Sequence, residues 1–173
     1  MNKLYPTVID GFNVYRNGNA LIGVSDEVQL PEFAATTASI SGAGILGTFD
    51  APVLGHFGSM DQVIPFRTLA EDVFSIMDPS QTVDLTLRGS VQYLDLESGA
   101  TSNKGMRVVF RGLMKSFTPG SVKAADEMKS SVTLSLTYIL IEVDGKTMIE
   151  LDKFNGVYKI NGVDCMAKIK SYT

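Results

Sequence analysis

The sequence predicts a mainly β protein: an antiparallel β-sandwich or partly closed barrel with one packed α-helix and a long extended hairpin. Three observations predict this fold class. Apolar and polar residues alternate with a period of two in several segments, as in strands that bury one face. Turn signals recur at short intervals between these segments. The 173 residues, 45% hydrophobic and 20% charged, have a globular composition and indicate a single domain over residues 1–173.

The N-terminal segment is predicted to form a hairpin of two short strands. Apolar residues at 12–15 and 21–24 flank the sequence Arg16-Asn17-Gly18-Asn19. Asn-Gly favours the positive φ angles of a two-residue turn. This segment therefore predicts a strand pair and not a cofactor site.

The stretch from Phe33 to Phe66 is the most unusual part of the chain. It contains five glycines, and its only formal charges are Asp50 and Asp61. β-Favouring residues on both sides of the glycines predict two extended arms joined by a flexible turn, over about residues 34–64. Such a stretch can bury little within its own domain, so we expect it to contact another chain. The expected contact residues are Gly42, Gly44, Ile45, Leu46, Gly47, Phe49, Val53, Leu54 and Phe57.

One helix is predicted, over about residues 68–77. Thr68 and Glu71 match a T-x-x-E capping box, and apolar residues recur at helical spacing from Leu69 to Met77. We expect this amphipathic helix to cover one face of a sheet.

The second half of the chain is predicted to be strands and short turns, with a helical tail from Asp164. Long strands follow from the alternation after Val83, after Met106 and after Val132. The polar segment 97–105 is predicted to be the turn between the first two. The shorter strands are predicted at 149–152 and 157–160, next to turns at Asp144-Gly145 and Asn161-Gly162.

The charges are unevenly distributed. Residues 1–100 hold four bases and twelve acids, whereas residues 101–173 hold eleven bases and seven acids. Such asymmetry often means only two solvated faces. Alternatively, surfaces of opposite sign meet when copies stack head to tail, in a contact that propagates.

Three bases, Arg107, Arg111 and Lys115, are predicted to share one face of a strand. Without aromatic residues among them they are a weak signal for nucleic-acid binding. A solvated or subunit-facing surface is the favoured interpretation.

No catalytic, cofactor or metal site is predicted. The G-x-G-x-x-G sequence at residues 42–47 is followed by residues that disfavour the helix a dinucleotide site requires. The single histidine, His56, is better explained as a packing or loop residue, and Glu150 and Asp152 as surface charge. One cysteine, Cys165, excludes an internal disulfide, and no segment is predicted to cross a membrane.

Several short segments together carry a family resemblance over nearly the whole chain. They are 10–14 (DGFNV), 21–24 (LIGV), 30–31 (LP), the glycine-rich 42–58, 142–146 (EVDGK), 149–152 (IELD), 155–158 (NGVY) and 161–164 (NGVD). In order and spacing they resemble the major tail tube proteins of contractile-tailed bacteriophages and of the phage-tail-like bacteriocins derived from them.

This resemblance implies a structural, non-enzymatic subunit. Family members form six-fold rings whose inner sheets join into one barrel around a lumen, and the rings stack into a tube inside a contractile sheath. The implied partners are further copies of the chain, the sheath protein, baseplate and tail-terminator proteins, and a tape-measure protein or DNA in the lumen. Sequence-specific nucleic-acid binding is not implied. The implied location is the host bacterial cytoplasm during assembly, then the virion tail or a released tail-like particle.

The resemblance also suggests roles for the Phe33–Phe66 stretch. Its arms would become ordered on assembly and grip a neighbouring subunit. An acidic lumen would repel the phosphates of passing DNA, and Asp50 and Asp61 are the candidates for that acidity.

Two alternative functions are consistent with the sequence. One is a monomeric ligand- or carbohydrate-binding β-sandwich with the glycine-rich stretch as a binding loop, although the chain lacks the tryptophan such sites favour. The other is the tube protein of a related secretion needle, whose lumen passes protein.

Overall fold

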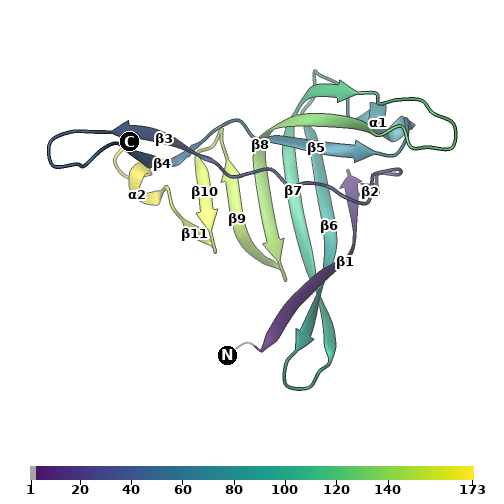
Figure 1. Ribbon diagram of the computed structural model, residues 1–173, viewed down its shortest axis with the longest axis horizontal. Helices are drawn as coiled ribbons and strands as arrows, with labels where there is room; N and C mark the ends of the chain where they lie inside the picture. The colour runs from purple at the N-terminus through teal and green to yellow at the C-terminus, as the bar shows by residue number, and fades with distance from the viewer. Residues whose placement is uncertain (1–2) are drawn as a thin grey trace.

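The computed structural model describes residues 3–173 and contains one nine-stranded antiparallel sheet and a separate two-stranded hairpin (Figure 1). The large sheet has the order β11-β10-β9-β8-β7-β6-β1-β2, with β5 paired to β8 beside this path. The predicted mainly β, antiparallel fold is confirmed, and the sheet stays open. The large sheet comprises β1 (Leu4–Arg16), β2 (Asn19–Ala20), β5 (Asp61–Phe66), β6 (Val83–Asp95), β7 (Thr101–Thr118), β8 (Ser130–Val143), β9 (Lys146–Asp152), β10 (Val157–Ile160) and β11 (Val163–Asp164). The remaining elements are β3 (Ala35–Ile40), β4 (Phe49–Phe57), α1 (Glu71–Ser75) and α2 (Ala167–Lys170).

Two-residue turns join three of the strand pairs. Asn17-Gly18, Asp144-Gly145 and Asn161-Gly162 each have positive φ at both positions, between 51° and 83°. This is the type I′ geometry that matches the twist of antiparallel strands. The predicted N-terminal hairpin is confirmed, although β1 has thirteen residues and β2 only two.

Strand β8 is shared between two neighbours on the same side. Its first half pairs with β5 and its second half with β9. A register shift at Thr137 accompanies a bend, so that β5 and the start of β8 run across the view in Figure 1 while β9 and the end of β8 run down it. This bend folds the sheet partly over itself.

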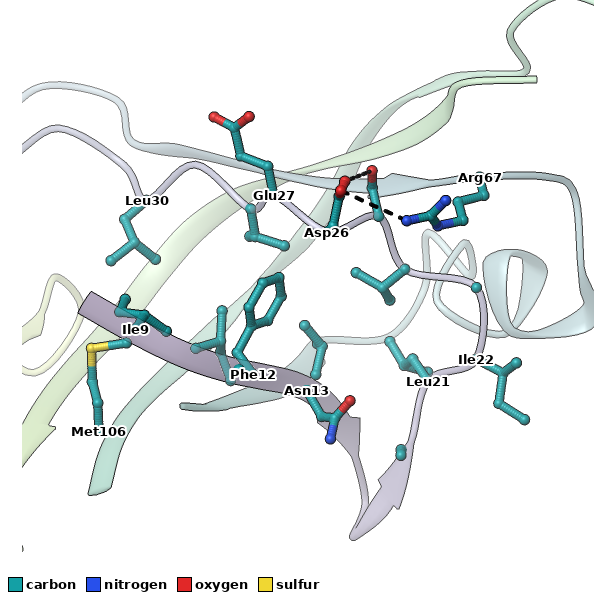
Figure 2. Close-up of a pocket in the computed structure, with 18 of the residues that line it drawn as sticks. Ile9, Phe12, Asn13, Leu21, Ile22, Asp26, Glu27, Leu30, Arg67 and Met106 are labelled. Atoms are coloured by element: carbon teal, nitrogen blue, oxygen red, sulfur yellow. Dashed lines mark hydrogen bonds and ion pairs between the residues drawn. The ribbon is translucent and has the colours of Figure 1, made fainter. Parts of the chain in front are cut away.

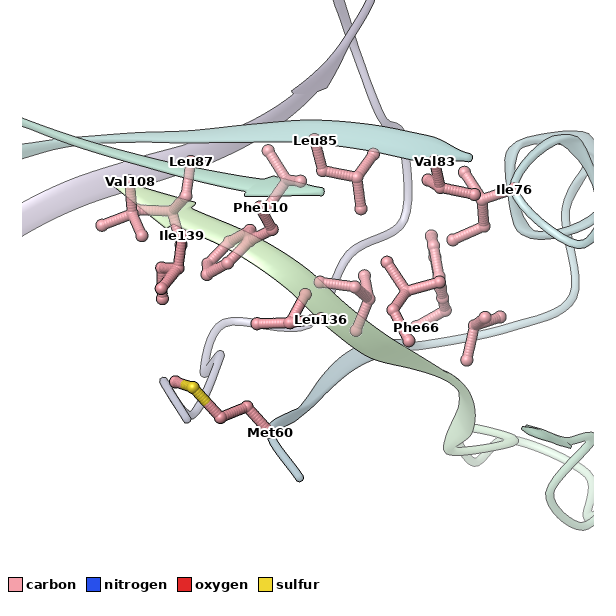
Figure 3. Packing of buried hydrophobic residues seen from close by; sticks show 14 of the residues in the cluster. Met60, Phe66, Ile76, Val83, Leu85, Leu87, Val108, Phe110, Leu136 and Ile139 are labelled. Atoms are coloured by element: carbon pink, nitrogen blue, oxygen red, sulfur yellow. The ribbon is translucent and has the colours of Figure 1, made fainter. Parts of the chain in front are cut away.

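The core lies within this bend (Figure 3). Side chains from β5, β6, β7 and β8 alternate inward, as expected for strands with one dry face, and Val73 of α1 packs against them. The fully buried hydrophobic side chains with the largest volumes are Phe66, Phe110, Ile64, Ile76, Leu85, Leu134 and Ile139.

Helix α1 is shorter than the predicted residues 68–77. It begins after Ala70, which makes no side-chain capping bond, so Thr68 does not form the predicted capping box. In a helix of little more than one turn, Val73 and Ile76 at i, i+3 spacing supply the buried contact, while Phe74 is 54% exposed. Tertiary packing thus selects a shorter helix than the sequence periodicity indicates.

Two predicted boundaries also change. The extended hairpin spans residues 35–57 and not 34–64, because β5 leaves it and buries Gln62 and Ile64 against β8. The predicted turn at 97–105 is shorter, because residues 101–105 pair with β6. The helical tail is present as α2.

Candidate assembly surface

The β3–β4 hairpin extends away from the rest of the molecule (Figure 1). Ser39 pairs with Asp50 and Ile40 with Phe49, and the loop of residues 41–48 connects the strands. Every residue from 34 to 50 is exposed. The two extended arms predicted from the sequence are therefore present, and their own chain leaves them uncovered.

The hairpin exposes a set of large apolar side chains. Leu46 at the tip is fully exposed, and Phe49 is 57% and Leu54 52% exposed. Ile45 and Val53 add smaller exposed areas. Several large exposed apolar side chains on one hairpin are typical of an interaction site in a folded protein.

The loop at the tip is a compact glycine turn. Gly44 and Gly47 have φ values of 89° and 105°, which favour glycine. The Ile45 amide donates to the Gly42 carbonyl at 3.1 Å. Strand β4 follows the loop at once, so the helix that a dinucleotide-binding G-x-G-x-x-G motif needs is replaced by a strand.

The base of the hairpin is anchored to the subunit. The ring of Phe57 makes edge-to-face contacts with Phe33 and Tyr158, with centroid distances of 6.3 and 5.0 Å. The side chain of Met166, just before α2, lies against Gly55. Of the predicted contact residues, Phe57 is thus half-buried in its own subunit, whereas those nearer the tip remain exposed.

The large sheet leaves one long edge open. Strand β1 pairs with β2 only at Tyr15 and Arg16, so residues 4–13 have no outer partner strand within residues 3–173. Tyr5 and Val8 on this segment are 59% and 57% exposed. Unpaired edge strands are templates for pairing with another chain.

The two predicted acidic lumen residues are on different sheets. Asp50 is in β4 of the hairpin. Asp61 opens β5 of the large sheet, where its carboxylate lies 2.6 Å from Lys115 Nζ. The structure does not bring these two acids together.

Each of the three bases predicted to share a face of β7 has a carboxylate partner from another strand. Register decides these pairs, so the sequence alone could not predict them. A hydrogen bond to the Glu142 carboxylate raises the pKa of Arg107. The pairs are Arg107 Nε with Glu142 at 2.6 Å, Arg111 Nη2 with Asp84 at 3.1 Å, and Lys115 Nζ with Asp61 at 2.6 Å.

The carboxylates of β9 have structural partners. The Tyr138 hydroxyl donates to Glu150 at 3.1 Å, and burial, followed by this hydrogen bond, raises the pKa of Tyr138 to about 12. Burial disfavours the charged form of Asp152, but hydrogen bonds from Asn155 and Phe154 outweigh it and lower the pKa of Asp152. Glu150 therefore links β8 to β9, and Asp152 stabilises the turn after β9.

The remaining candidate catalytic residues are isolated. His56 is exposed on β4, and Cys165 is half-buried after β11. Within residues 3–173 no three His, Cys, Asp or Glu side chains are placed to hold a metal ion. In the same part of the chain, neither helix has the length and apolar character needed to span a bilayer.

An open, mainly apolar groove lies between β1 and the segment that follows β2 (Figure 2). Ile9, Phe12, Leu21 and Leu30 line it. At its rim Arg67 lies 3.8 Å from Asp26. The sequence did not predict this groove, because its apolar and polar lining residues come from separate segments.

Known proteins resemble the chain over almost its whole length. The family model described as phage tail tube protein FII matches residues 6–172. The tail tube protein of Escherichia phage P2 is 29% identical over 164 residues, which cover 92% of each chain. The major tail tube protein of Serratia phage KSP20 is 27% identical over 151 residues, covering 87% of this chain and 85% of that protein.

A solved structure has a related fold. The sheath/tube terminator of an extracellular contractile injection system, PVC, in its extended state matches with a TM-score of 0.52 and 16% identity, over 80% of this chain and 97% of that chain. At this identity the match concerns the fold. The family match over residues 6–172 identifies the chain as a member of the phage tail tube protein FII family.

Proposed function

We propose that copies of this chain close into hexameric rings and that the rings stack into a hollow tube inside a contractile sheath. The observation that carries this proposal is the exposed apolar tip of the β3–β4 hairpin, which finds no cover in its own subunit. In a tube of stacked subunits, a neighbouring copy would cover this tip.

The hairpin is the proposed stacking element. Burial of a side chain such as Leu46 or Phe49 contributes about 1.5–3 kcal/mol. A contact between the hairpin of one copy and a different surface of the next is heterologous, and such contacts propagate or form rings. The anchored base around Phe57 fixes the direction in which the hairpin leaves the subunit.

The open β1 edge is the proposed site of closure within a ring. Residues 4–13 offer backbone groups and exposed side chains to a strand of the adjacent copy. Joining the sheets of neighbouring copies would remove the aggregation risk of an exposed edge.

The other proposed partners follow from tube geometry in a contractile particle. The sheath protein surrounds the tube, and baseplate and tail-terminator proteins contact its ends. A tape-measure protein or DNA occupies the lumen for part of the cycle. Assembly takes place in the host cytoplasm, and the chain has a structural role with no catalysis.

We also infer that Asp50 and Asp61 contribute to an acidic lumen. Asp50 is exposed on the hairpin, and Asp61 is exposed at the start of β5. Carboxylates along the passage would keep the phosphates of moving DNA from adhering to the wall.

Electron microscopy of the purified full chain tests this proposal. Negative-stain images and sedimentation velocity are collected over a range of protein concentrations. The expected result is rings and stacked tubes with six-fold end views. A compact monomer at every concentration would contradict the proposal and favour a ligand-binding module that uses the apolar groove beside β1.

A further inference from the structure

The face of the large sheet that points away from the core carries a belt of alternating charges. Its side chains come from the strand positions between the buried ones, such as Asp84 between Val83 and Leu85. We call these residues the charged face. They are Asp84 and Arg88 on β6, Arg107, Arg111 and Lys115 on β7, Glu142 on β8, Glu150 and Asp152 on β9, Lys159 on β10, and Asp61 on β5.

Strand register places several acids directly opposite bases, although Arg88 on β6 is paired with Arg107 on β7. Arg111 lies between Asp84 on β6 and Tyr138 on β8, and Asp152 on β9 follows in the same row. In a neighbouring row Glu150 faces Lys159. Cross-strand neighbours of opposite charge stabilise a sheet, whereas like charges destabilise it.

The contacts form a chain across the strands. Arg111 donates to one Asp84 oxygen from Nε and Nη2 at 3.2 and 3.1 Å, and its guanidinium lies 4.9 Å from the centroid of the Tyr138 ring. Tyr138 then donates to Glu150, whose carboxylate is 4.0 Å from Lys159. The cations are thus held by fixed carboxylates and an aromatic ring.

The belt combines both signs of charge. The ten residues named above are five acids and five bases, and four of the bases have a carboxylate within 4.0 Å. The fifth, Arg88, lies over the Tyr15 ring at 5.3 Å. Asp164, paired with Lys159, and Asp10, which accepts from Ser90, add acidic groups at its two edges. The excess of bases after residue 100 is therefore neutralised on this face by acids from several strands.

A face of this kind is poorly suited to the centre of a subunit contact. Interface centres are depleted in charged residues and enriched in aromatic and apolar ones. Two exposed apolar side chains, Val63 and Leu113, lie among its charges, whereas larger sets of exposed apolar side chains are on the hairpin and along β1. The charged face is therefore expected to stay in contact with water after assembly.

We propose that the charged face is the wall of the passage and that its carboxylates keep the β7 cations away from the phosphates of a polyanion in transit. This inference rests on the proposed function. When a sheath covers the outside of a tube, the wall of the lumen is the large surface that stays in contact with water. Arg107, Arg111 and Lys115 without their partners would form a phosphate-binding row. With the partners in place, the wall offers a nucleic acid no net attraction.

The first experiment tests, in the single subunit, whether the carboxylates keep the β7 cations from binding phosphates. The double variant Asp84→Asn/Glu142→Gln frees Arg111 and Arg107, and Glu32→Gln/Glu71→Gln makes the same charge change at exposed positions away from the face. Binding of a short fluorescent DNA duplex is followed by anisotropy at low and moderate salt. We expect Asp84→Asn/Glu142→Gln, but not the control, to bind DNA at least about tenfold more tightly than the unaltered chain. Its plot of log binding constant against log salt concentration should also be steeper by about 2.

Equal DNA binding by both double variants would contradict the proposal that the carboxylates keep the cations from phosphates. Circular dichroism establishes that each variant is folded. If Asp84→Asn/Glu142→Gln does not fold, Asp61→Asn frees Lys115 and is measured against Glu71→Gln in the same way.

The second experiment tests the position of the face in assembled tubes. Thr86→Cys, between Asp84 and Arg88, is made in a Cys165→Ser background and treated with a small maleimide and with a maleimide coupled to a bulky protein. We expect both reagents to label the single subunit but only the small one to label tubes.

Equal labelling of tubes by both reagents would place the charged face on the outside of the tube. Labelling of tubes by neither reagent would place it in a subunit contact. Each of these results overturns the proposal. If no tubes form, the proposed function fails, while the DNA measurement still tests whether the carboxylates keep the cations from phosphates.

Discussion

The backbone at Gly112 lies so close to Ser135 that a Cβ atom on residue 112 would overlap the Ser135 carbonyl oxygen. The two residues are adjacent to the register shift where β7 and β8 bend. A side chain of any size at this point would push the strands apart. The bend that folds the sheet over the core therefore depends on a glycine.

Gly112→Ala is expected to lower the free energy of unfolding by about 1–3 kcal/mol, because neighbouring backbone must shift. Urea denaturation followed by circular dichroism measures the change. Gly105→Ala, on the same strand, places its Cβ in open space and is the matched control. Equal destabilisation by both substitutions would show that close approach at Gly112 is not the cause.

The phenol of Tyr138 should make stability depend on alkaline pH. Its pKa is raised to about 12, first by burial and then by Glu150, so the folded chain keeps a proton that the unfolded chain loses above its ordinary pKa near 10. This stabilisation is complete below pH 10 and is lost as the pH rises towards 12.

Absorbance titration of the tyrosinate band checks this expectation. Tyr138→Phe should remove one late-ionising tyrosine and make the fall in unfolding free energy between pH 10 and 12 shallower. Tyr158, whose pKa burial also raises, remains in both proteins as an internal reference. Loss of absorbance change near pH 10, with the late phase unchanged, would show that Tyr138 ionises normally.

Leu46→Asp at the hairpin tip should prevent tube formation and leave the subunit folded. The side chain is fully exposed in the subunit, so we expect a change in unfolding free energy within about 0.5 kcal/mol. Val122→Asp, at an 88% exposed site in another loop, is the control. Sedimentation should recover tubes from the control and not from Leu46→Asp; tubes from both would exclude the tip as a contact.

Charge reversal tests the acidic lumen. Asp50→Lys/Asp61→Lys should slow DNA ejection and make the surface potential of the tube more positive, since phosphates are attracted to a basic wall. Asp61→Asn, which breaks the pair with Lys115 without adding a cation, should have a smaller effect. Ejection and surface potential equal to those of the unaltered tube would refute the role of these acids.

Local sequence patterns predicted much of the fold. Alternation of apolar and polar residues gave the strands β6 and β8, and the Asn17-Gly18 turn gave the first hairpin. The exposed β3–β4 hairpin followed from a glycine-rich stretch with few charges. These features depend on neighbours in the sequence, so their physical causes can be seen there.

Features that depend on distant contacts could not be predicted in this way. Strand β5 looked like part of the hairpin, because only its pairing with β8 shows which of its side chains are buried. Helix α1 is cut short by packing. The partners of Arg107 and Arg111 come from β8 and β6, and the register that joins them is a property of the folded sheet.

Amide hydrogen exchange of the β3–β4 hairpin measures whether a neighbouring copy covers it on assembly. A two-stranded hairpin alone is marginally stable in water. We predict rapid exchange for residues 36–54 in the single subunit, strong protection of the same amides in tubes, and protection of β6 and β7 in both states. Protection of the hairpin in the isolated chain equal to that of β6 and β7, with no filaments at any concentration, would contradict this prediction.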